Sequence, residues 1–299
     1  MSQKTISNLN PELVTELMTK VRGYSVLAKL SNQSAIPFNG TEQFIFNLDG
    51  NAQIVGEGEQ KLGSNSSFQS KIIKPIKFVY QSRITDEFMN TTDEKRINYL
   101  QAYADGFAKK IAVAFDIAAL HGLEPRTMTD ATFRNTNSFD GQVTDDIVVF
   151  DATKIDDNLD TAVQTVVANG YDVNGIALSP LAGQSLAKLK VNGVVQYPEF
   201  RFGQNPESFY GMTSDINKNL VTIGGVGSTA KKDHGIVGDF QSMFKWGYAE
   251  NIPMKVIEYG DPDGTGRDLQ AYNEICLRTE AYIGWGILDT EAFARIEEA

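Results

Sequence analysis

The spacing of apolar side chains predicts one long helix in the first half of the chain. Over residues 91–121 these side chains recur every three or four positions, as they do along one face of an α-helix. Thr91 and Glu94 have the capping-box spacing expected at its start, and Gly122 stands where a C-cap glycine would end it. At 1.5 Å per residue the helix would be about 40–45 Å long, which suits the spine of an elongated domain. The core-facing positions of this spine helix include Leu100, Phe107 and Ile111.

Two extended segments before this helix predict a long β-hairpin. Apolar and polar residues alternate over residues 44–48 and again over 68–80, with an interruption at Pro75. The polar, glycine-rich segment 56–67 lies between them and offers little apolar surface to bury. A two-stranded hairpin is marginally stable alone, so we expect it to lie on a neighbouring subunit; a β-meander with a mobile loop is the alternative. The charged residues expected to make contact at the hairpin tip are Glu57, Glu59 and Lys61.

The first 35 residues have the pattern of an arm rather than of a domain. Asn10 can cap a short helix that opens with Pro11, and Gly23 can end it. This helix has too little surface to fold by itself. We therefore expect the arm to pack on another element.

The middle of the chain alternates between helical and extended patterns. A helix is predicted over residues 156–170, a strand over 175–179, and a second helix from Pro180. Several short strands follow, at 193–198, 209–212, 220–223 and 235–239. Helix, strand, helix and then several strands describe a compact α/β lobe.

The last quarter of the chain predicts long antiparallel strands. Apolar and polar residues alternate around 252–259 and again over 274–280, as a half-buried strand requires. The glycine- and aspartate-rich segment 260–266 between them predicts a turn or a flexible loop. Taken alone, this pattern would equally fit a hairpin in any α+β domain.

Composition sets the class of protein. The chain has 299 residues, of which 41% are hydrophobic and 22% charged, enough to bury the core of one large or two modest domains. It shows neither an apolar run of the roughly 18 residues a membrane span needs nor a secretion signal. The single cysteine, Cys276, excludes an intramolecular disulfide framework. The net charge of −11 argues against a large surface that binds nucleic acid.

No group of residues has the spacing of a catalytic, cofactor-binding or metal-binding motif. His121 suits capping at the end of the spine helix, and His234 is expected in a turn. Cys276 falls inside a strand pattern and is expected to be a buried thiol rather than a nucleophile. Residues 224–229 lack the lysine of a phosphate loop and predict a hairpin turn. The loop at 261–268 lacks the last acidic ligand of a calcium loop.

Four motifs follow one another near the end of the chain. They are Gly-Asp-Phe at 238–240, a strand over 246–258 that ends in an acidic residue, Arg-Thr-Glu at 278–280 and Ala-Phe at 292–293. In this order they resemble the end of a tailed-phage major capsid protein of the HK97-type fold. The hairpin sequence 54–86 and the strand and turn at 174–180 resemble other parts of the same fold.

This resemblance implies an α+β protein with an N-terminal arm, an extended hairpin called the E-loop, a peripheral domain and an α/β axial domain. The peripheral domain would hold the spine helix and the long antiparallel strands. Some relatives crosslink subunits through a lysine at the hairpin tip, but no acceptor matches beside Lys61, so no crosslink is expected. The implied parts are the arm at 1–35, the hairpin and start of the peripheral domain at 36–82, the spine-helix part at 83–134, the axial domain at 135–245 and the returning strands at 246–299.

The function implied is a structural one rather than an enzymatic one. Copies would assemble into pentamers and hexamers of an icosahedral shell that encloses double-stranded DNA without sequence-specific binding. The expected partners are further copies, a separate scaffolding protein and a portal, with no membrane and no cofactor, and with assembly in the host cytoplasm leading to the virion. One alternative is an encapsulin-type compartment that loads enzyme cargo. A second is an enzyme of the α/β lobe, such as a hydrolase.

Overall fold

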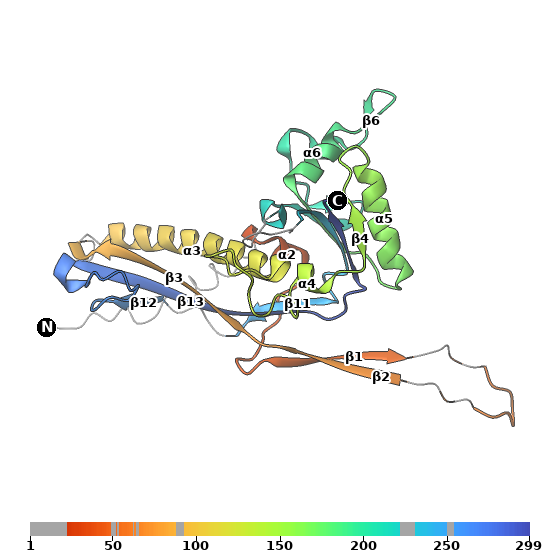
Figure 1. Ribbon diagram of the computed structural model, residues 1–299, viewed down its shortest axis with the longest axis horizontal. Helices are drawn as coiled ribbons and strands as arrows, with labels where there is room; N and C mark the ends of the chain where they lie inside the picture. The colour runs from red at the N-terminus through yellow and green to blue at the C-terminus, as the bar shows by residue number, and fades with distance from the viewer. Residues whose placement is uncertain are drawn as a thin grey trace.

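The protein has three visible parts (Figure 1). Helix α3 (Asp93–His121) and strand β13 (Glu274–Ile287) run side by side along a limb, a β-hairpin projects from its base, and an α/β lobe lies at one end. The expected helix before Gly23 and the expected turn at 224–229 lie outside the residues that the structure describes. This computed structural model describes residues 23–299 except for gaps at 49–51, 53, 62, 64–65, 88–92, 222–230 and 250–253.

Helix α3 confirms the predicted spine. Phe107 and Ile111 on its apolar stripe are buried, with 1% and 3% of their surface exposed. Gly122 has a φ of +63° and its N–H donates to the Ala118 carbonyl oxygen at 3.0 Å, so it ends the helix as predicted. The expected cap at Thr91 and the side chain of Leu100 lie outside the described residues.

The limb is completed by an antiparallel sheet built on β13. Strand β3 (Ile76–Thr85) pairs with one edge of β13, while β11 (Phe244–Tyr248) and β12 (Met254–Ile257) pair with the other. Both faces of β13 are covered, since Ile275, Cys276 and Leu277 are all buried. The strand predicted over 274–280 is therefore confirmed, but it is not half-exposed. Of the strand predicted around 252–259, the described residues show only the short β12. The core of the limb contains packed aromatic rings. The centroids of the Trp285 and Phe115 rings lie 5.7 Å apart, with the rings edge-on.

The predicted hairpin is formed by β1 (Thr41–Leu48) and β2 (Ser66–Ile73), which pair in antiparallel register with Phe46 opposite Phe68. Its root is fixed by close packing on the limb. The Ile73 side chain lies on Gly286, where an added Cβ would come within 2.8 Å of it. After Lys74 and Pro75 the chain leaves the hairpin and enters β3, so the run that was predicted as one strand belongs to two sheets.

The lobe contains a six-stranded mixed sheet. Alternate residues of its strands point to opposite faces: Ile176 and Val237 pack on the helices α5 (Ile155–Ala168) and α6 (Pro180–Lys188), whereas Ile236 belongs to the core shared with α3. Both predicted helices are confirmed. The sheet order is β4 (Ile147–Val149), β14 (Phe293–Glu297), β10 (Asp233–Gly238), β5 (Gly175–Leu178), β9 (Met212–Ile216) and β8 (Ser208–Phe209). The shorter elements are α4 (Phe139–Gln142), β6 (Lys190–Val191), β7 (Val194–Val195) and the 3-10 segments η2 (Pro198–Gly203), η3 (Lys218–Val221) and η4 (Gln270–Tyr272).

Four local expectations differ from the structure. The segment 209–212 was expected to be one strand, but Tyr210 and Gly211 form the turn between β8 and β9, because Phe209 pairs with Met212. Leu220 and Val221 form a 3-10 turn rather than a strand, because Leu220 is drawn into the core below α3. His234 lies in strand β10 and not in a turn, since its neighbours pair with β14 and β5. The helix α2 (Val26–Leu30), in the segment assigned to the arm, packs in this chain's own core, with Val26 and Leu27 fully buried.

Candidate functional site

The hairpin tip is a tight turn at Gly56–Glu59. The Glu59 N–H donates to the Gly56 carbonyl oxygen at 3.2 Å, and the Gly56 N–H donates to the Glu59 carboxylate at 3.0 Å. Glu57, Glu59 and Lys61, the residues predicted at the hairpin tip, are exposed. Ile54 beside them is 98% exposed, which the sequence analysis did not anticipate. The tip therefore presents a bare apolar side chain next to two carboxylates.

The hairpin also exposes one face along its length. The register places Phe44 and Ile72 on the same face, and each is 59% exposed. On the opposite face Ile73 packs on the limb, and the Lys71 ammonium donates to Gln142 Oε1 at 2.7 Å. Burial lowers the pKa of Lys71, although Asp289 nearby partly offsets it. One face is thus anchored, and the other turns apolar residues away from the limb.

An open groove of about 1200 Å³ runs along the limb between α3, β3 and the loop Leu123–Phe133. Four acidic residues line it, and all have partners. Glu280 pairs with Lys77, Asp130 with Arg134 and Asp263 with Arg83, and the Glu124 carboxylate accepts from the Arg126 and Thr127 N–H groups. Lys110 and Arg126 also line it, and the Arg126 charge helps to lower the pKa of the neighbouring Glu124 carboxylate. The groove thus combines apolar walls with the positive charges of Lys110 and Arg126.

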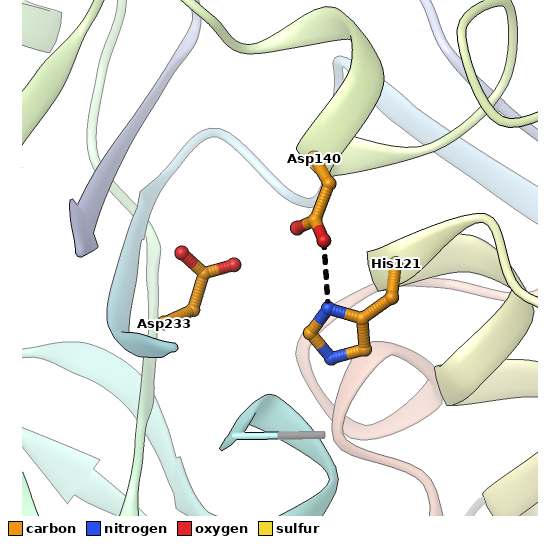
Figure 2. A group of neighbouring side chains, drawn as sticks. All are labelled: His121, Asp140 and Asp233. Atoms are coloured by element: carbon orange, nitrogen blue, oxygen red, sulfur yellow. Dashed lines mark hydrogen bonds and ion pairs between the residues drawn. The ribbon is translucent and has the colours of Figure 1, made fainter. Parts of the chain in front are cut away.

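A network of buried charges joins the end of α3 to the lobe (Figure 2). The His121 Nδ1 lies 3.0 Å from Asp140 Oδ2, and its Nε2 lies 2.9 Å from the Asn219 carbonyl oxygen. A carbonyl oxygen only accepts and a carboxylate does the same, so both imidazole nitrogens carry protons. Burial alone would lower the pKa of His121, but the hydrogen bond to Asp140 and the nearby carboxylates outweigh it and raise this pKa.

Arg295 supplies the second cation of this network. Its Nη2 lies 2.9 Å from Asp233 Oδ1 and 3.2 Å from Asp140 Oδ1, and its Nη1 donates to the Val143 carbonyl oxygen at 3.0 Å. Burial and the neighbouring Asp140 carboxylate raise the pKa of Asp233. The atoms of His121, Asp140 and Asp233 could surround a metal ion, since they lie within 4.8 Å of one another. However, a guanidinium already pairs with both carboxylates and the imidazole has no free nitrogen, so the donor set suits an ion network better than a metal.

A second buried carboxylate holds the segment before the hairpin. Asp116 on α3 accepts hydrogen bonds from Ser25 Oγ at 2.5 Å and from the Val26 N–H at 3.0 Å. The Asn219 amide donates to the same carboxylate at 2.8 Å. Burial raises the pKa of Asp116 to about 6, although these hydrogen bonds oppose the rise. Asp116 therefore accepts from the N–H groups at the start of α2 that have no partner within the helix.

In the lobe, a serine, a histidine and a glutamate that are far apart in the sequence lie in contact with one another. Ser179 Oγ lies 2.9 Å from His234 Nδ1, and His234 Nε2 lies 3.3 Å from Glu298 Oε1. This arrangement bears on the hydrolase alternative, because a Ser–His–carboxylate relay can activate a nucleophile. Ser179 is fully buried, and its hydroxyl caps α6 by accepting the Ala182 N–H at 3.0 Å. The relay thus lacks an exposed nucleophile, and its geometry is that of a helix cap.

The loop Gly260–Gly266 closes around Arg83. The Arg83 Nη2 lies 2.7 Å from Asp261 Oδ1, and Asp263 pairs with the same guanidinium. Thr265 Oγ1 and the Arg267 carbonyl oxygen also accept from Arg83. The segment predicted as a turn or flexible loop is therefore an ordered turn that surrounds the Arg83 guanidinium. Cys276 is buried as predicted, and burial raises the pKa of its thiol.

Among the described residues, no helix is long and apolar enough to span a membrane. The chain is 25% identical over 310 residues to the probable major capsid protein gp17 of Mycobacterium phage D29, covering 96% of this chain and 89% of that protein. A solved structure from Mycobacterium phage Ogopogo is 30% identical, with a TM-score of 0.77 and 92% of each chain covered. One from Gordonia phage Cozz is 25% identical, with a TM-score of 0.72, and covers 92% of this chain and 86% of that one.

The fold is also shared with a capsid structure of a native GTA particle, at a TM-score of 0.62 and 12% identity over all of this chain and 94% of that one. The HK97-type α+β fold expected from the sequence is confirmed by these likenesses. The model of the phage capsid family matches residues 8–297, nearly the whole length of the sequence. The chain belongs to the phage capsid family, and it is a structural protein of the capsid.

Proposed function

We propose that copies of this capsid protein form the pentamers and hexamers of an icosahedral shell that encloses double-stranded DNA. The observation that supports this most directly is the hairpin. Its outward face exposes Phe44 and Ile72, and its tip exposes Ile54 almost completely. A two-stranded ribbon with such a face needs another surface to cover it. Many modest contacts of this kind add up when each subunit meets several others.

Each part of the chain is proposed to form one domain of the capsid subunit. The limb forms the peripheral domain and the lobe forms the axial domain, with the boundaries expected from the sequence at 36–82, 83–134, 135–245 and 246–299. The arm is confined to the residues before Ser25, because α2 belongs to the core. A separate scaffolding protein and a portal would guide assembly in the host cytoplasm, and the DNA would be held without sequence-specific contacts.

The surface of a neighbouring copy best suited to the hairpin tip is the limb groove. Its apolar walls suit Ile54, and the positive charges of Lys110 and Arg126 complement Glu57 and Glu59 at the tip. Such an interface is heterologous, since one patch meets a different patch on the next copy. Heterologous contacts close into rings when the rotation between copies allows it.

The test is to express the chain alone and with its neighbouring genes, and to examine the product by mass photometry and negative-stain electron microscopy. We expect rings or shells in at least one of these two expression experiments. A protein that stays monomeric in both experiments at every concentration would overturn the proposal.

Exchanging the charges tests the proposed contact between the hairpin tip and the limb groove of a neighbouring copy. Glu57→Lys with Glu59→Lys should reduce particle yield, and so should Lys110→Glu with Arg126→Glu. Combining all four substitutions should restore assembly, because the complementary signs are re-created. A fourfold variant that assembles no better than either pair would show that the tip sits elsewhere.

A further inference from the structure

The loop between β12 and β13 has most of the sequence of a calcium-binding loop. Such loops bind the ion through side chains at positions 1, 3 and 5 and through the carbonyl oxygen of position 7, with a glycine at position 6. In this chain the same positions hold Asp261, Asp263, Thr265, Arg267 and Gly266, in that order. Position 12, where an acidic residue would bind the ion, is Tyr272. The sequence alone therefore describes an incomplete site.

The backbone of this segment is folded as a calcium loop requires. Gly266 has a φ of +78°, in the left-handed region that favours glycine. The Asp261 carboxylate accepts from the Thr265 N–H at 3.1 Å and from the Gly266 N–H at 2.6 Å, and so holds the turn in place. The Leu269 N–H donates to the Gly260 carbonyl oxygen at 2.9 Å. This last bond closes the loop at its base.

The strand that follows the loop supplies the missing acidic group. Glu274, the first residue of β13, lies two positions beyond position 12, yet its carboxylate faces the same centre as those of Asp261 and Asp263. The Thr265 hydroxyl and the Arg267 carbonyl oxygen face it too. Calcium takes about six to eight oxygen ligands, and each carboxylate can supply one or two of them. These groups together are therefore enough to hold a calcium ion.

A guanidinium occupies the centre of this loop. The Arg83 side chain, from β3, donates through Nε to Asp263 at 2.8 Å and through Nη2 to Asp261 at 2.7 Å. The same Nη2 donates to Thr265 Oγ1 at 3.0 Å. Its Nη1 donates to the Arg267 carbonyl oxygen at 2.8 Å and to Glu274 at 3.3 Å. One arginine thus binds every oxygen-bearing group that would surround the metal.

The electrostatics of the loop are those of an occupied cation site. Hydrogen bonds to Asp263 and Glu274 raise the pKa of Arg83, and the hydrogen bond from Arg83 holds the pKa of Asp263 far below its usual range. The guanidinium has five N–H donors in one plane, so it also fixes the directions of its partners. Strand β3 pairs with β13, which brings Arg83 and Glu274 to the same loop. Figure 1 shows this end of β13 at the end of the limb away from the lobe.

We propose that Arg83 is the internal cation of a calcium-type loop, and that the loop becomes a calcium-binding site when the guanidinium is removed. In the wild-type chain the arginine excludes the metal, because both would need the same oxygens. Neither chelators nor changes in calcium concentration would then disturb this end of the limb. The inference concerns the subunit itself and does not depend on the proposed assembly.

The test measures the unfolding temperature of the full chain in EDTA and in about 5 mM calcium chloride, at equal ionic strength. The wild type should unfold within about 1 °C in the two solutions, since its loop is already occupied. Arg83→Ser should unfold about 5 °C lower in EDTA, because three carboxylates lose the cation between them. Calcium should restore at least about half of that loss. Magnesium should restore less, because it requires a smaller, octahedral site.

Three variants separate binding in the loop from effects elsewhere. Arg83→Ser with Asp261→Asn lacks the first ligand and should show no recovery in calcium. Arg83→Lys keeps a positive charge in the loop, so it should stay folded and also show no recovery. Arg134→Ser is the matched control, since it removes an arginine that pairs with an aspartate outside this loop. It should not respond to calcium.

Two results would overturn the proposal. One is a wild type that calcium stabilises as strongly as it stabilises Arg83→Ser, since the arginine would then not fill the loop. The other is an Arg83→Ser chain that calcium does not stabilise. If this variant does not stay folded in EDTA, refolding it with and without calcium gives the same comparison, and equal recovery of folded protein would count against the site.

Discussion

The Asp116 carboxylate on α3 accepts a hydrogen bond from Ser25 Oγ, 91 positions earlier in the sequence, and so ties the start of α2 to the middle of the spine helix. Both residues are buried, with 0% and 1% of their surface exposed. The bond links a segment assigned to the arm with the core of the limb. Its strength can be measured because the carboxylate can be removed or neutralised independently.

Removing the carboxylate should destabilise the subunit. Asp116→Ala leaves the Ser25 hydroxyl, the Val26 N–H and the Asn219 amide without an acceptor in a buried site. We expect a loss of about 3 kcal/mol in the free energy of unfolding, since each unpaired buried group costs about 1–3 kcal/mol. Asp116→Asn keeps an acceptor of the same shape and should lose less. Urea unfolding followed by circular dichroism measures both, and an equal loss in the two variants would contradict this account.

The same carboxylate predicts a pH dependence of unusual sign. Burial raises the pKa of Asp116 to about 6 from 3.8, so the folded chain binds this proton more tightly than the unfolded chain. The contribution of this group to stability therefore rises as the pH falls from about 7 to about 4, by on the order of 2 kcal/mol. The measurement is the difference in unfolding free energy between wild type and Asp116→Asn at several pH values. A difference that is independent of pH would rule out the shift.

The core position Phe107 should be among the most sensitive in the limb. It is 1% exposed on the stripe of α3, and Phe107→Ala would open a cavity costing about 3–5 kcal/mol. That is a large part of the stability of an ordinary domain, so particle yield should fall with it. Tyr259→Ala, at a side chain that is 64% exposed, is the control and should change stability by less than about 0.5 kcal/mol. Normal thermal stability of Phe107→Ala would show that the helix packs differently.

Breaking the buried ion network should also destabilise the lobe. His121→Ala removes the imidazolium and leaves the Asp140 carboxylate facing Arg295 alone. Removing one partner of a buried ion pair costs about 3–5 kcal/mol. Asp145→Ala, an exposed carboxylate nearby in sequence, should be neutral. Thermal unfolding of the two variants decides, and equal melting temperatures would mean that the network contributes nothing.

The hairpin tip should become protected only on assembly. Within the isolated subunit the turn Gly56–Glu59 has one backbone hydrogen bond, and the residues around it are exposed. Amide exchange there should be fast in the free subunit and much slower in particles. Ile54→Ser should leave subunit stability unchanged and weaken assembly, because the side chain buries nothing within its own subunit. Identical exchange in free and assembled protein would place the tip outside every contact.

Elements with a strong local period were predictable from the sequence. The stripe of α3, the helices after Asp156 and Pro180, and the two strands of the hairpin all follow from alternation or helical spacing between neighbours. The structure of other segments depends on contacts with residues far away in the sequence. His234 becomes a strand residue because β10 is flanked by β14 and β5, and Leu220 becomes a turn residue because α3 covers it.

The candidate contacts were only partly predictable for the same reason. Glu57, Glu59 and Lys61 could be placed at a tip because polar, glycine-rich sequence marks a turn. The exposure of Ile54 could not be predicted, because an apolar residue gives no sign of being bare until the fold shows that nothing covers it. The meeting of His121, Asp140, Asp233 and Arg295 depends on four separate segments, which no local pattern joins.

The pairing of β3 with β13 has a consequence for how the chain reaches an assembly-competent state. Tyr80 pairs with Thr279, and Ser34 bonds to Trp246, so the limb sheet joins the first third of the chain to its last quarter. During synthesis the hairpin and spine helix leave the ribosome long before the strand they pack against. Closing such distant contacts is slow, and the intermediate exposes apolar surface meanwhile. A truncated or unfinished chain thus lacks the base that orients its hairpin, so only completed subunits can present that hairpin correctly to a neighbour.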